Sequence, residues 1–562
     1  MSTTIEPRVH EQPEHPEAHP AHVSYLQDGY SIWSWLFTVD HKRIGILYLV
    51  FLTLFFAVGG TFAGLVRLNL ISPHGAILDN DTYNKTFTAH GVVMLFLFLI
   101  PSIPAMMGNF FVPIMVGAKD MAFPKLNIAS WYVWMLGSFV AIWALITGGL
   151  DTGWTLYPPY SSRFSHTNVV PGVFGVFILG FSSIMTGLNI LVTIHRMRAP
   201  GMTWGRLPLF CWAMYATSLI QLLATPVLAI TVALLGIEAA SNALGTPIGI
   251  FDPAMDGDPI LFQHMFWFYS HPAVYIMIIP GMGVVSEILT CFSRKNIFGY
   301  TAVAWSSVGI AVIGFLVWAH HMFVAGISYY AALLFSFLTM LVAVPSAIKV
   351  FNWTSTLYRG QISFQAPMIF ALGFLVLFTI GGLTGIPLAT LGSDIHFHDT
   401  YYVVAHFHFV MVGGMVLAYL GALHYWWPKM FGVMYSDFWS RIGSILIIVG
   451  YILTFMPQFW LGYHGMPRRY PNYPPEFQFL NIMSTAGYTV QLAGFLTIAT
   501  YLTLSFFTGK KAGTNPWGAT GLEWETATPP ITHNFEHTPR VVCGPYEYSL
   551  NLTQTGGRAD VR

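Results

Sequence analysis

The chain has 562 residues, of which 55% are hydrophobic and only 9% are charged. Because soluble proteins carry about 25% charged residues, this composition excludes an ordinary soluble domain and indicates an integral membrane protein. The formal net charge of zero argues against a nucleic-acid partner, which requires a basic surface.

Apolar segments close to twenty residues long recur along the chain, and a helix of that length spans about 30 Å of hydrocarbon. About twelve are predicted, beginning near Ile44, Thr86, Ala129, Val170, Pro208, Pro259, Phe298, Tyr329, Phe364, His398, Arg441 and Leu480. The loops between them are short, and no change in composition divides the series. We therefore expect an all-α integral membrane protein, a single bundle of about twelve transmembrane helices formed by residues 30–511.

Two tails flank this bundle. Residues 1–29 contain a His-, Pro- and Glu-rich stretch, residues 512–562 are rich in Pro and Gly, and both tails are expected to be flexible. The first forty residues or so lack the basic start and apolar core of a signal peptide. The three cysteines lie far apart without a CxxC motif, so neither a disulfide framework nor a thiolate metal site is expected.

The lysines and arginines predict the orientation in the membrane. Outside the tails, most fall at helix ends that alternate onto one side, and the other side has only Arg67, Lys85, Arg163, Arg468 and Arg469. Both termini are therefore expected to be cytoplasmic. The pair Arg468 and Arg469, in GMPRRY, opposes the charge bias and requires another explanation.

Six histidines lie in or at the ends of the predicted spans, where a buried ionisable group is costly and usually functional. They come from four separate helices and share the outer half or the middle of the membrane: His90, His271, His320, His321, His406 and His408. A single membrane histidine is often only hydrogen-bonded to a neighbouring helix. Six at a common depth favour metal binding.

Helix geometry divides these histidines between sites. His406 and His408 point about 200° apart on one helix, so they must serve two different centres. His320 and His321 point about 100° apart and can both face one ion, to which His271 could add a third nitrogen. Three imidazoles suit copper or zinc, whereas two trans-axial imidazoles suit a low-spin haem.

Long motifs resemble subunit I of the haem-copper terminal oxidases. The similarity runs from VDHKRIG through the last span, and the motifs that carry it are GNFFVPIMVGAKDMAFPKLN, TGWTLYPPYSS, DPILFQHMFWFYSHPAVY, VWAHHMF, HDTYYVVAHFHFV and GMPRRY. The resemblance implies a proton-pumping cytochrome c oxidase that reduces O2 to water. It assigns the low-spin haem to His90 and His408, the high-spin haem to His406, and copper B to His271, His320 and His321.

The resemblance also implies a special role for Tyr275. In the family this tyrosine is covalently linked to the histidine that matches His271 and supplies an electron and a proton. The i, i+4 spacing places both side chains on one face of the helix.

One proton route departs from the commonest family pattern. Ala273 stands where most members have a glutamate that ends the D pathway, and Tyr269, on the same face, with Ser270 beside it, is the candidate replacement. This YS pattern resembles the branch that includes caa3-type oxidases. A plain core aromatic near a haem is the alternative for Tyr269. In the rest of the route, Asp120 matches the carboxylate at the inlet. The polar positions along the route are matched by Asn109, Asn127, Asn189, Ser182 and Ser183.

A second proton route is expected at Lys349 in VPSAIKVF, with Ser346 and Thr384, leading towards Tyr275. Without the resemblance, a lysine at this depth could simply extend to the membrane surface.

On the outer side, the resemblance implies binding sites for anions and for a magnesium ion. Arg468 and Arg469, with Trp154, match the cluster that binds the haem propionates, and guanidinium groups bind carboxylates strongly. His398 and Asp399 match a magnesium site that another subunit completes. Arg67 matches the arginine that holds the formyl group of haem A, although haem O or haem B could fit the same histidines.

The implied partners follow from what the chain lacks. It encodes no dinuclear copper centre, so electrons are expected through a subunit II that carries one, with or without its own cytochrome c domain, alongside subunit III and small subunits. The span Ile44–Val66 contains no charge, amide or imidazole, which favours cytochrome c over quinol as the donor. The expected location is a bacterial inner membrane.

Two alternative functions remain open. A nitric oxide reductase of the same superfamily is disfavoured by Tyr275, Lys349 and Asp120, which those relatives lack. A twelve-span secondary transporter explains the length and the orientation but not the histidines.

Overall fold

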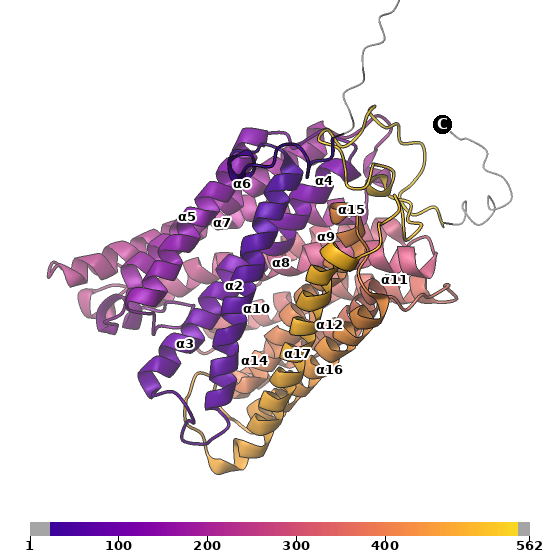
Figure 1. The fold of residues 1–562 in the computed structure, drawn as a ribbon. Coiled ribbons are helices and arrows are strands. Elements are labelled where there is room, and N and C mark those ends of the chain that lie inside the picture. Colours follow the sequence, from indigo (N-terminus) through magenta and orange to yellow (C-terminus); the bar gives the residue numbers. More distant parts are fainter. Residues whose placement is uncertain (1–22, 549–562) are drawn as a thin grey trace, which may run out of the picture.

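The computed structural model describes residues 23–548, which fold into one bundle of long helices without named strands (Figure 1). The α-helices are α1 (Ile32–Leu36), α2 (His41–Asn69), α3 (Asn80–Val92), α4 (Asn109–Met115), α5 (Pro124–Thr147), α6 (Val169–Arg196), α7 (Leu209–Ala243), α8 (Pro259–Ser293), α9 (Tyr300–Gly314), α10 (Tyr329–Leu341), α11 (Ala343–Leu357), α12 (Ala366–Ala389), α13 (Leu391–Phe397), α14 (Tyr401–Val410), α15 (Leu417–Phe431), α16 (Asp437–Tyr463) and α17 (Gln478–Thr508). The 3₁₀ helices are η4 (Trp204–Arg206), η5 (Pro253–Met255), η6 (Trp318–Met322), η8 (Pro475–Phe477) and η9 (Leu522–Trp524), and the π-helical segments are η1 (Val93–Leu99), η2 (Ser102–Gly108), η3 (Tyr160–Phe164) and η7 (Met411–Val416).

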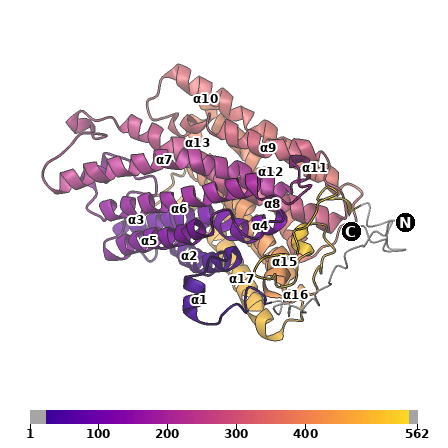
Figure 2. The same cartoon turned by 90° about the horizontal axis from the view of Figure 1, so that it is seen from above.

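Within the described residues, 11 helical spans are long and apolar enough to cross a membrane. They follow the predicted order, and their starts lie within a few residues of the predicted ones. Figure 2 shows α8 inside the bundle and α10 at its rim. Accordingly, α8 and the span from α3 to α4 are mostly buried, whereas α2 and the span from α10 to α11 are mostly exposed at the surface of the subunit. The expected all-α membrane bundle is confirmed.

The seventh predicted span differs from a regular transmembrane helix. Its helix, α9, has 15 residues, about 22 Å at 1.5 Å per residue, and falls short of the hydrocarbon thickness. The chain continues through the 3₁₀ helix η6, so His320 and His321 lie on a tighter turn than the α-helix expected for them. Irregular backbone is tolerated at this depth because Val317, Ala319 and Met322 are fully buried in protein.

Two of the spans that carry histidines are interrupted by π-helical segments. The span from α3 to α4 passes through η1 and η2, next to Pro101 and Pro104, and the span from α14 to α15 passes through η7, which contains Gly413 and Gly414. Proline removes a backbone donor and displaces the helical ladder, and π turns are frequent at functional sites. In both spans the π-helical segment begins directly after the α-helix that carries the histidines.

The tails differ from the flexible segments expected from their composition, as far as they are described. Residues 512–548 lie across the end of the bundle near α4 and α15 (Figure 1), where Trp517, Trp524 and Tyr546 are buried. Tyr25, from the predicted N-terminal tail, is also buried and donates a hydrogen bond to the Met430 carbonyl at 2.8 Å. The composition of this segment is polar overall, but a few aromatic side chains spaced along it are enough to pack it against the bundle. Residues 1–22 and 549–562 lie outside the described part, and the boundaries at 29/30 and 511/512 stay predictions.

Candidate metal centre

Three histidines from two elements converge on one point. His271 of α8 and His320 and His321 of η6 each offer a ring nitrogen, and these nitrogens lie within 4.8 Å of one another. The Nδ1 atom of His271 is 3.2 Å from the Nε2 atom of His321. Imidazole nitrogens bind a metal at about 2.0–2.1 Å, so two ligands of one ion lie within about 4 Å of each other. The three side chains already approach this spacing.

Neighbouring side chains fix the orientation of this histidine triad. The ring of Trp267 stacks on His321 with 3.7 Å between centroids and 11° between planes. The Nδ1 atom of His320 lies 3.1 Å from the hydroxyl of Thr339 on α10, which leaves Nε2 as its ligand atom. Trp267 could have been found from the sequence, since it precedes His271 by one helical turn. Thr339 belongs to a separate helix and gives no such signal.

Tyr275 lies against the triad. Its ring centroid is 4.8 Å from that of His271, and Nε2 of His271 is buried without a hydrogen-bond partner among the described residues. Gly314 of α9 makes this position available, because a Cβ there would lie 2.5 Å from Cδ2 of Tyr275. A larger residue at 314 would displace the tyrosine ring.

A second pair of histidines faces each other across a gap. The rings of His90 on α3 and His408 on α14 have centroids 6.5 Å apart and planes within 4°. The Nδ1 atoms lie 2.9 Å from the Gly59 carbonyl and 2.8 Å from the Val404 carbonyl, respectively. Both imidazoles therefore donate through Nδ1 and keep the Nε2 lone pair for a ligand. Phe455 of α16 stacks on His408 at 4.2 Å.

His406 points away from His408, to the opposite side of α14, as the helical angle between the two residues predicts. Its Nδ1 atom lies 2.9 Å from the Gly381 carbonyl and 3.3 Å from the Thr384 hydroxyl, both on α12. Gly385 permits this close packing, since a Cβ there would lie 2.8 Å from Cε1 of His406. The structure thus brings Thr384 to His406, whereas the sequence suggested a place beside Lys349.

One cavity connects all of these groups. It has a volume of about 1810 Å³ and is lined by the three histidines of the triad, by His90, His406 and His408, and by Tyr275. Pockets for single ligands measure about 300–1,000 Å³, so this cavity has room for more than one large group. Its donors are imidazole nitrogens without thiolates, a set that suits copper and haem iron.

Comparison with known proteins identifies the family. The family model "Cytochrome C and Quinol oxidase polypeptide I" matches residues 43–490. The chain belongs to this family. It is 45% identical over 515 residues to the cytochrome c oxidase subunit 1 of Synechocystis sp., covering 92% of each chain, and 41% identical over 546 residues to that of Thermostichus vulcanus, covering 96% of each.

A further relative, the cytochrome c oxidase subunit 1 of Bacillus subtilis, is 39% identical over 518 residues, which cover 91% of this chain and 82% of the relative. The fold also matches a solved structure described as a heme-copper terminal oxidase dimer, with a TM-score of 0.73 and 21% identity over 84% of this chain and 85% of that one. The resemblance seen in the motifs is thereby confirmed. The family implies haems and copper B, together with a subunit II.

The oxidase has a row of basic and aromatic side chains where the cavity meets the end of the bundle opposite the described termini. Trp154, Arg468 and Arg469 line the cavity there. Arg468 forms an ion pair with Asp399 at 2.5 Å, and His398 Nδ1 lies 3.1 Å from the carboxylate of Asp394. Asp394 was not predicted, although it is an acid four residues before His398, and the structure shows it buried.

Arg67 also lines the cavity and retains free donors. Its Nη2 donates to the Asn481 carbonyl at 2.9 Å, whereas Nε and Nη1 are buried without a partner among the described residues. A buried guanidinium with unused N–H groups requires an acceptor. Arg67 is therefore suited to a polar substituent of a group bound in the cavity.

The residues predicted for the first proton route fall into two groups. Asn189 exchanges hydrogen bonds with the backbone of Phe123, and Ser182 donates to the Ser130 carbonyl at 2.8 Å, so both are already paired. Four others keep buried polar atoms without partners in the described chain: Asn109 Oδ1, both amide atoms of Asn127, Ser183 Oγ and Ser270 Oγ. Buried unpaired groups of this kind are usually satisfied by ordered water. Asp120 accepts a hydrogen bond from the backbone N–H of Met121 at 2.6 Å.

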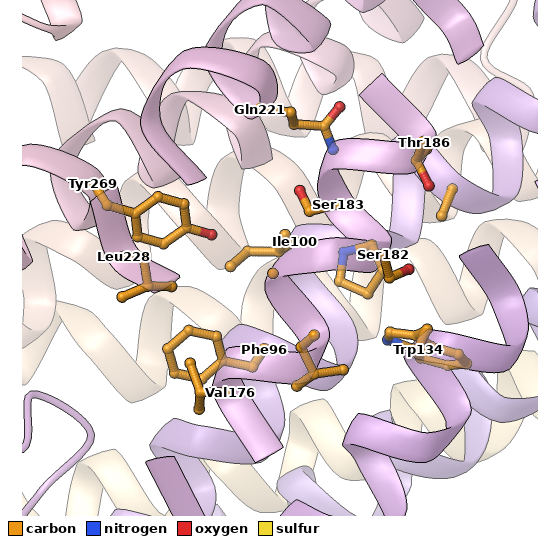
Figure 3. Close-up of a pocket in the computed structure, with 14 residues that line it drawn as sticks. Phe96, Ile100, Trp134, Val176, Ser182, Ser183, Thr186, Gln221, Leu228 and Tyr269 are labelled. Atoms are coloured by element: carbon orange, nitrogen blue, oxygen red, sulfur yellow. The ribbon is translucent and has the colours of Figure 1, made fainter. Parts of the chain in front are cut away.

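Tyr269 borders a small pocket on this route (Figure 3). The pocket has a volume of about 30 Å³ and is also lined by Ser183, Thr186 and Gln221. Figure 3 shows the Tyr269 hydroxyl directed into this space. Because one water needs about 10–15 Å³, the pocket holds about two. The sequence did not point to Gln221, whose Oε1 is buried and unpaired within residues 23–548.

The second route contains a fully buried lysine. Lys349 Nζ donates to the Ser307 hydroxyl at 2.8 Å and to the Val303 carbonyl at 3.0 Å, both on α9. Ser346 lies one turn before it and lines the large cavity. Ser307 was not predicted, because it lies on another helix. Lys349 is therefore enclosed by protein and does not reach the membrane surface.

Proposed function

We propose that the chain is the catalytic subunit I of a proton-pumping cytochrome c oxidase. The observation that carries this is one cavity lined by a histidine triad, a separate His406 and a facing pair of histidines. His90 and His408 would hold the low-spin haem, His406 the high-spin haem, and His271, His320 and His321 copper B. When bound, these groups would pass on the electrons of cytochrome c and provide the site at which O2, four electrons and four protons become two water molecules.

The protein's own residues orient the ligands and deliver protons. The carbonyls of Gly59, Val404 and Gly381 each accept from the Nδ1 of one haem-binding histidine and thereby fix its tautomer and its rotation. Tyr275 supplies a proton and an electron at the triad. With Nδ1 of His271 turned to His321, the unpaired Nε2 atom is left for the covalent link to the Tyr275 ring.

We assign the proton routes to the two sets of buried polar groups. Asp120 is the inlet of the first, and Asn109, Asn127, Asn189, Ser182 and Ser183 lead from it towards Tyr269 and Ser270. Burial raises the pKa of Asp120 to about 7, which suits a group that exchanges protons at neutral pH. Lys349, Ser346 and Ser307 form the second route, towards Tyr275.

The other cofactor assignments depend on groups at the cavity wall. The unused donors of Arg67 favour haem A, whose formyl oxygen would accept from them. Arg468, Arg469 and Trp154 would bind the propionates. His398 and Asp399 would hold magnesium together with subunit II, since no third ligand from the described residues joins them.

The surroundings of the subunit complete the proposal. It lies in a bacterial inner membrane with both termini cytoplasmic, assembled with a subunit II that bears a dinuclear copper centre, with or without a cytochrome c domain, and with subunit III and small subunits. Cytochrome c is the donor, because the part of α2 between Ile44 and Val66 has no charged, amide or imidazole side chain that could bind a quinol.

The purified complex tests this function directly. We expect a Soret band, extractable haem A, copper, and O2 uptake with reduced cytochrome c. Consumption of nitric oxide without O2 uptake would identify a nitric oxide reductase instead. A colourless protein without haem would favour the secondary transporter.

Tyr269→Phe tests the altered proton route. Removing the hydroxyl takes one polar partner from the waters of the small pocket, so we expect slower turnover or fewer protons ejected per electron, with haem and copper content unchanged. Proton ejection is measured in vesicles with a pH-sensitive dye. Tyr160→Phe, an exposed tyrosine bonded to Asp151, is the control. Unchanged ejection in Tyr269→Phe would leave Tyr269 as a packing residue.

A further inference from the structure

We propose that Asn534, in the C-terminal segment, is a positioning residue for proton uptake: it holds the buried ammonium of Lys42 and the loop that carries Asp120. This inference rests on the proposed role of Asp120 as the inlet. It also gives a function to the segment 512–548, which composition alone presented as a flexible tail.

The Asn534 side chain is fully buried against the inlet loop. Its Nδ2 donates to the carbonyls of Ala118 at 2.9 Å and Lys119 at 3.3 Å, the two residues that precede Asp120. Its Oδ1 accepts from Lys42 Nζ at 2.9 Å. One amide thus joins the start of α2 to the loop between α4 and α5.

Lys42 depends on the C-terminal segment for most of its hydrogen bonds. Its Nζ is fully buried and lies 3.1 Å from Asp40 Oδ1, 2.8 Å from the Thr532 carbonyl and 2.9 Å from Asn534 Oδ1. These acceptors match the three donors of an ammonium. Because a buried charge is costly unless it is paired and hydrogen-bonded, the segment determines where this charge can lie.

The position of the ammonium matters to Asp120. The pKa of Asp120 is raised to about 7, mainly by burial and in part by the negative charge of Asp40, while the positive charge of Lys42 acts to lower it. The neighbouring His41 donates through Nδ1 to the Asn109 carbonyl at 2.6 Å, so its Nε2 atom accepts from Asn534 Nδ2 at 2.9 Å. Asn534 therefore contacts the loop that carries the inlet, and His41 connects it to the backbone of Asn109.

Among the described residues of the C-terminal segment, a neutral side chain makes the contacts with Lys42 and the inlet loop. His533, Glu536 and His537 are exposed to solvent, and the side chain that enters the protein is the neutral Asn534. The backbone of Asn534 is left-handed, with φ of 66°, a conformation that asparagine and glycine tolerate best. Glycine at 534 therefore removes the amide without adding backbone strain.

The test uses the intact oxidase in vesicles. For Asn534→Gly we expect proton uptake from the side of the C-terminal segment, and turnover with it, to fall about tenfold, since small misplacements of proton-transfer groups have effects of this order or larger. Haem and copper content should be unchanged. Asn515→Gly is the matched control, because the Asn515 amide bonds only to the backbone of Ala519 in the same segment. Equal rates in the two variants would overturn the inference.

Asn534→Asp provides an independent readout that does not depend on a lower rate. A carboxylate at this position draws the Lys42 charge towards itself and adds negative charge near Asp120, so the midpoint of the pH profile of proton uptake should move upward. An unmoved midpoint would overturn the inference.

Asp120→Asn separates the two proposals. Unchanged proton uptake in that variant would show that the assigned inlet is wrong, and the inference about Asn534 would fail with it. Impaired uptake in Asp120→Asn, combined with normal uptake in Asn534→Gly, would contradict the role of Asn534 alone.

Discussion

Tyr275→Phe is expected to reduce O2 consumption by about 10²–10⁴-fold, the range usually lost with an essential proton donor, while both haems and copper stay bound. The tyrosine ring lies 4.8 Å from His271, and phenylalanine fills the same space beside Gly314 without the hydroxyl. Oxygen uptake with reduced cytochrome c measures the loss, and the absorption spectrum verifies the haems.

Tyr419→Phe is the matched control for this result. Tyr419 lines the same cavity, and its hydroxyl is buried without a partner among the residues described, so its removal breaks no hydrogen bond seen in the structure. We expect it to retain turnover. Normal oxygen consumption in Tyr275→Phe would exclude the proposed role of the hydroxyl.

His320→Ala is expected to lose copper and, with it, activity by at least about 100-fold, because even the outer-shell partners of metal ligands contribute about 10–100-fold. Two imidazoles of the triad remain, from His271 and His321, too few to hold the ion through purification. Metal analysis should show copper lost and iron retained, since His90, His406 and His408 are separate from the triad.

His195→Ala controls for the general effect of removing a histidine. His195 lies at the exposed end of α6, bonded to Tyr215, far along the chain from every residue of the triad. Copper retained at the wild-type level in His320→Ala would place the metal elsewhere.

Much of the metal centre could be predicted from local spacing. The opposite directions of His406 and His408, and the shared face of His271 and Tyr275, follow from the helical repeat alone. The motifs then placed both pairs in a family that the comparisons confirm. These predictions held because each depends only on residues within one helix.

Other features could not be predicted because their partners come from separate elements. The carbonyls of Gly59 and Gly381, which orient His90 and His406, carry no side-chain signal. Thr339 reaches His320 from α10. The helix expected to carry His320 also ends early, at Gly314, and the histidines follow on a 3₁₀ turn.

The sequence by itself determined the membrane class, the order of the spans and the identity of the histidines, since these depend on hydropathy and on a helical period that any window of the chain displays. Only the tertiary structure decided which carbonyls orient the imidazoles and that Asn534 lies against the loop of Asp120. A hydrogen bond between residues hundreds of positions apart forms through packing of the whole bundle, and no local pattern encodes it.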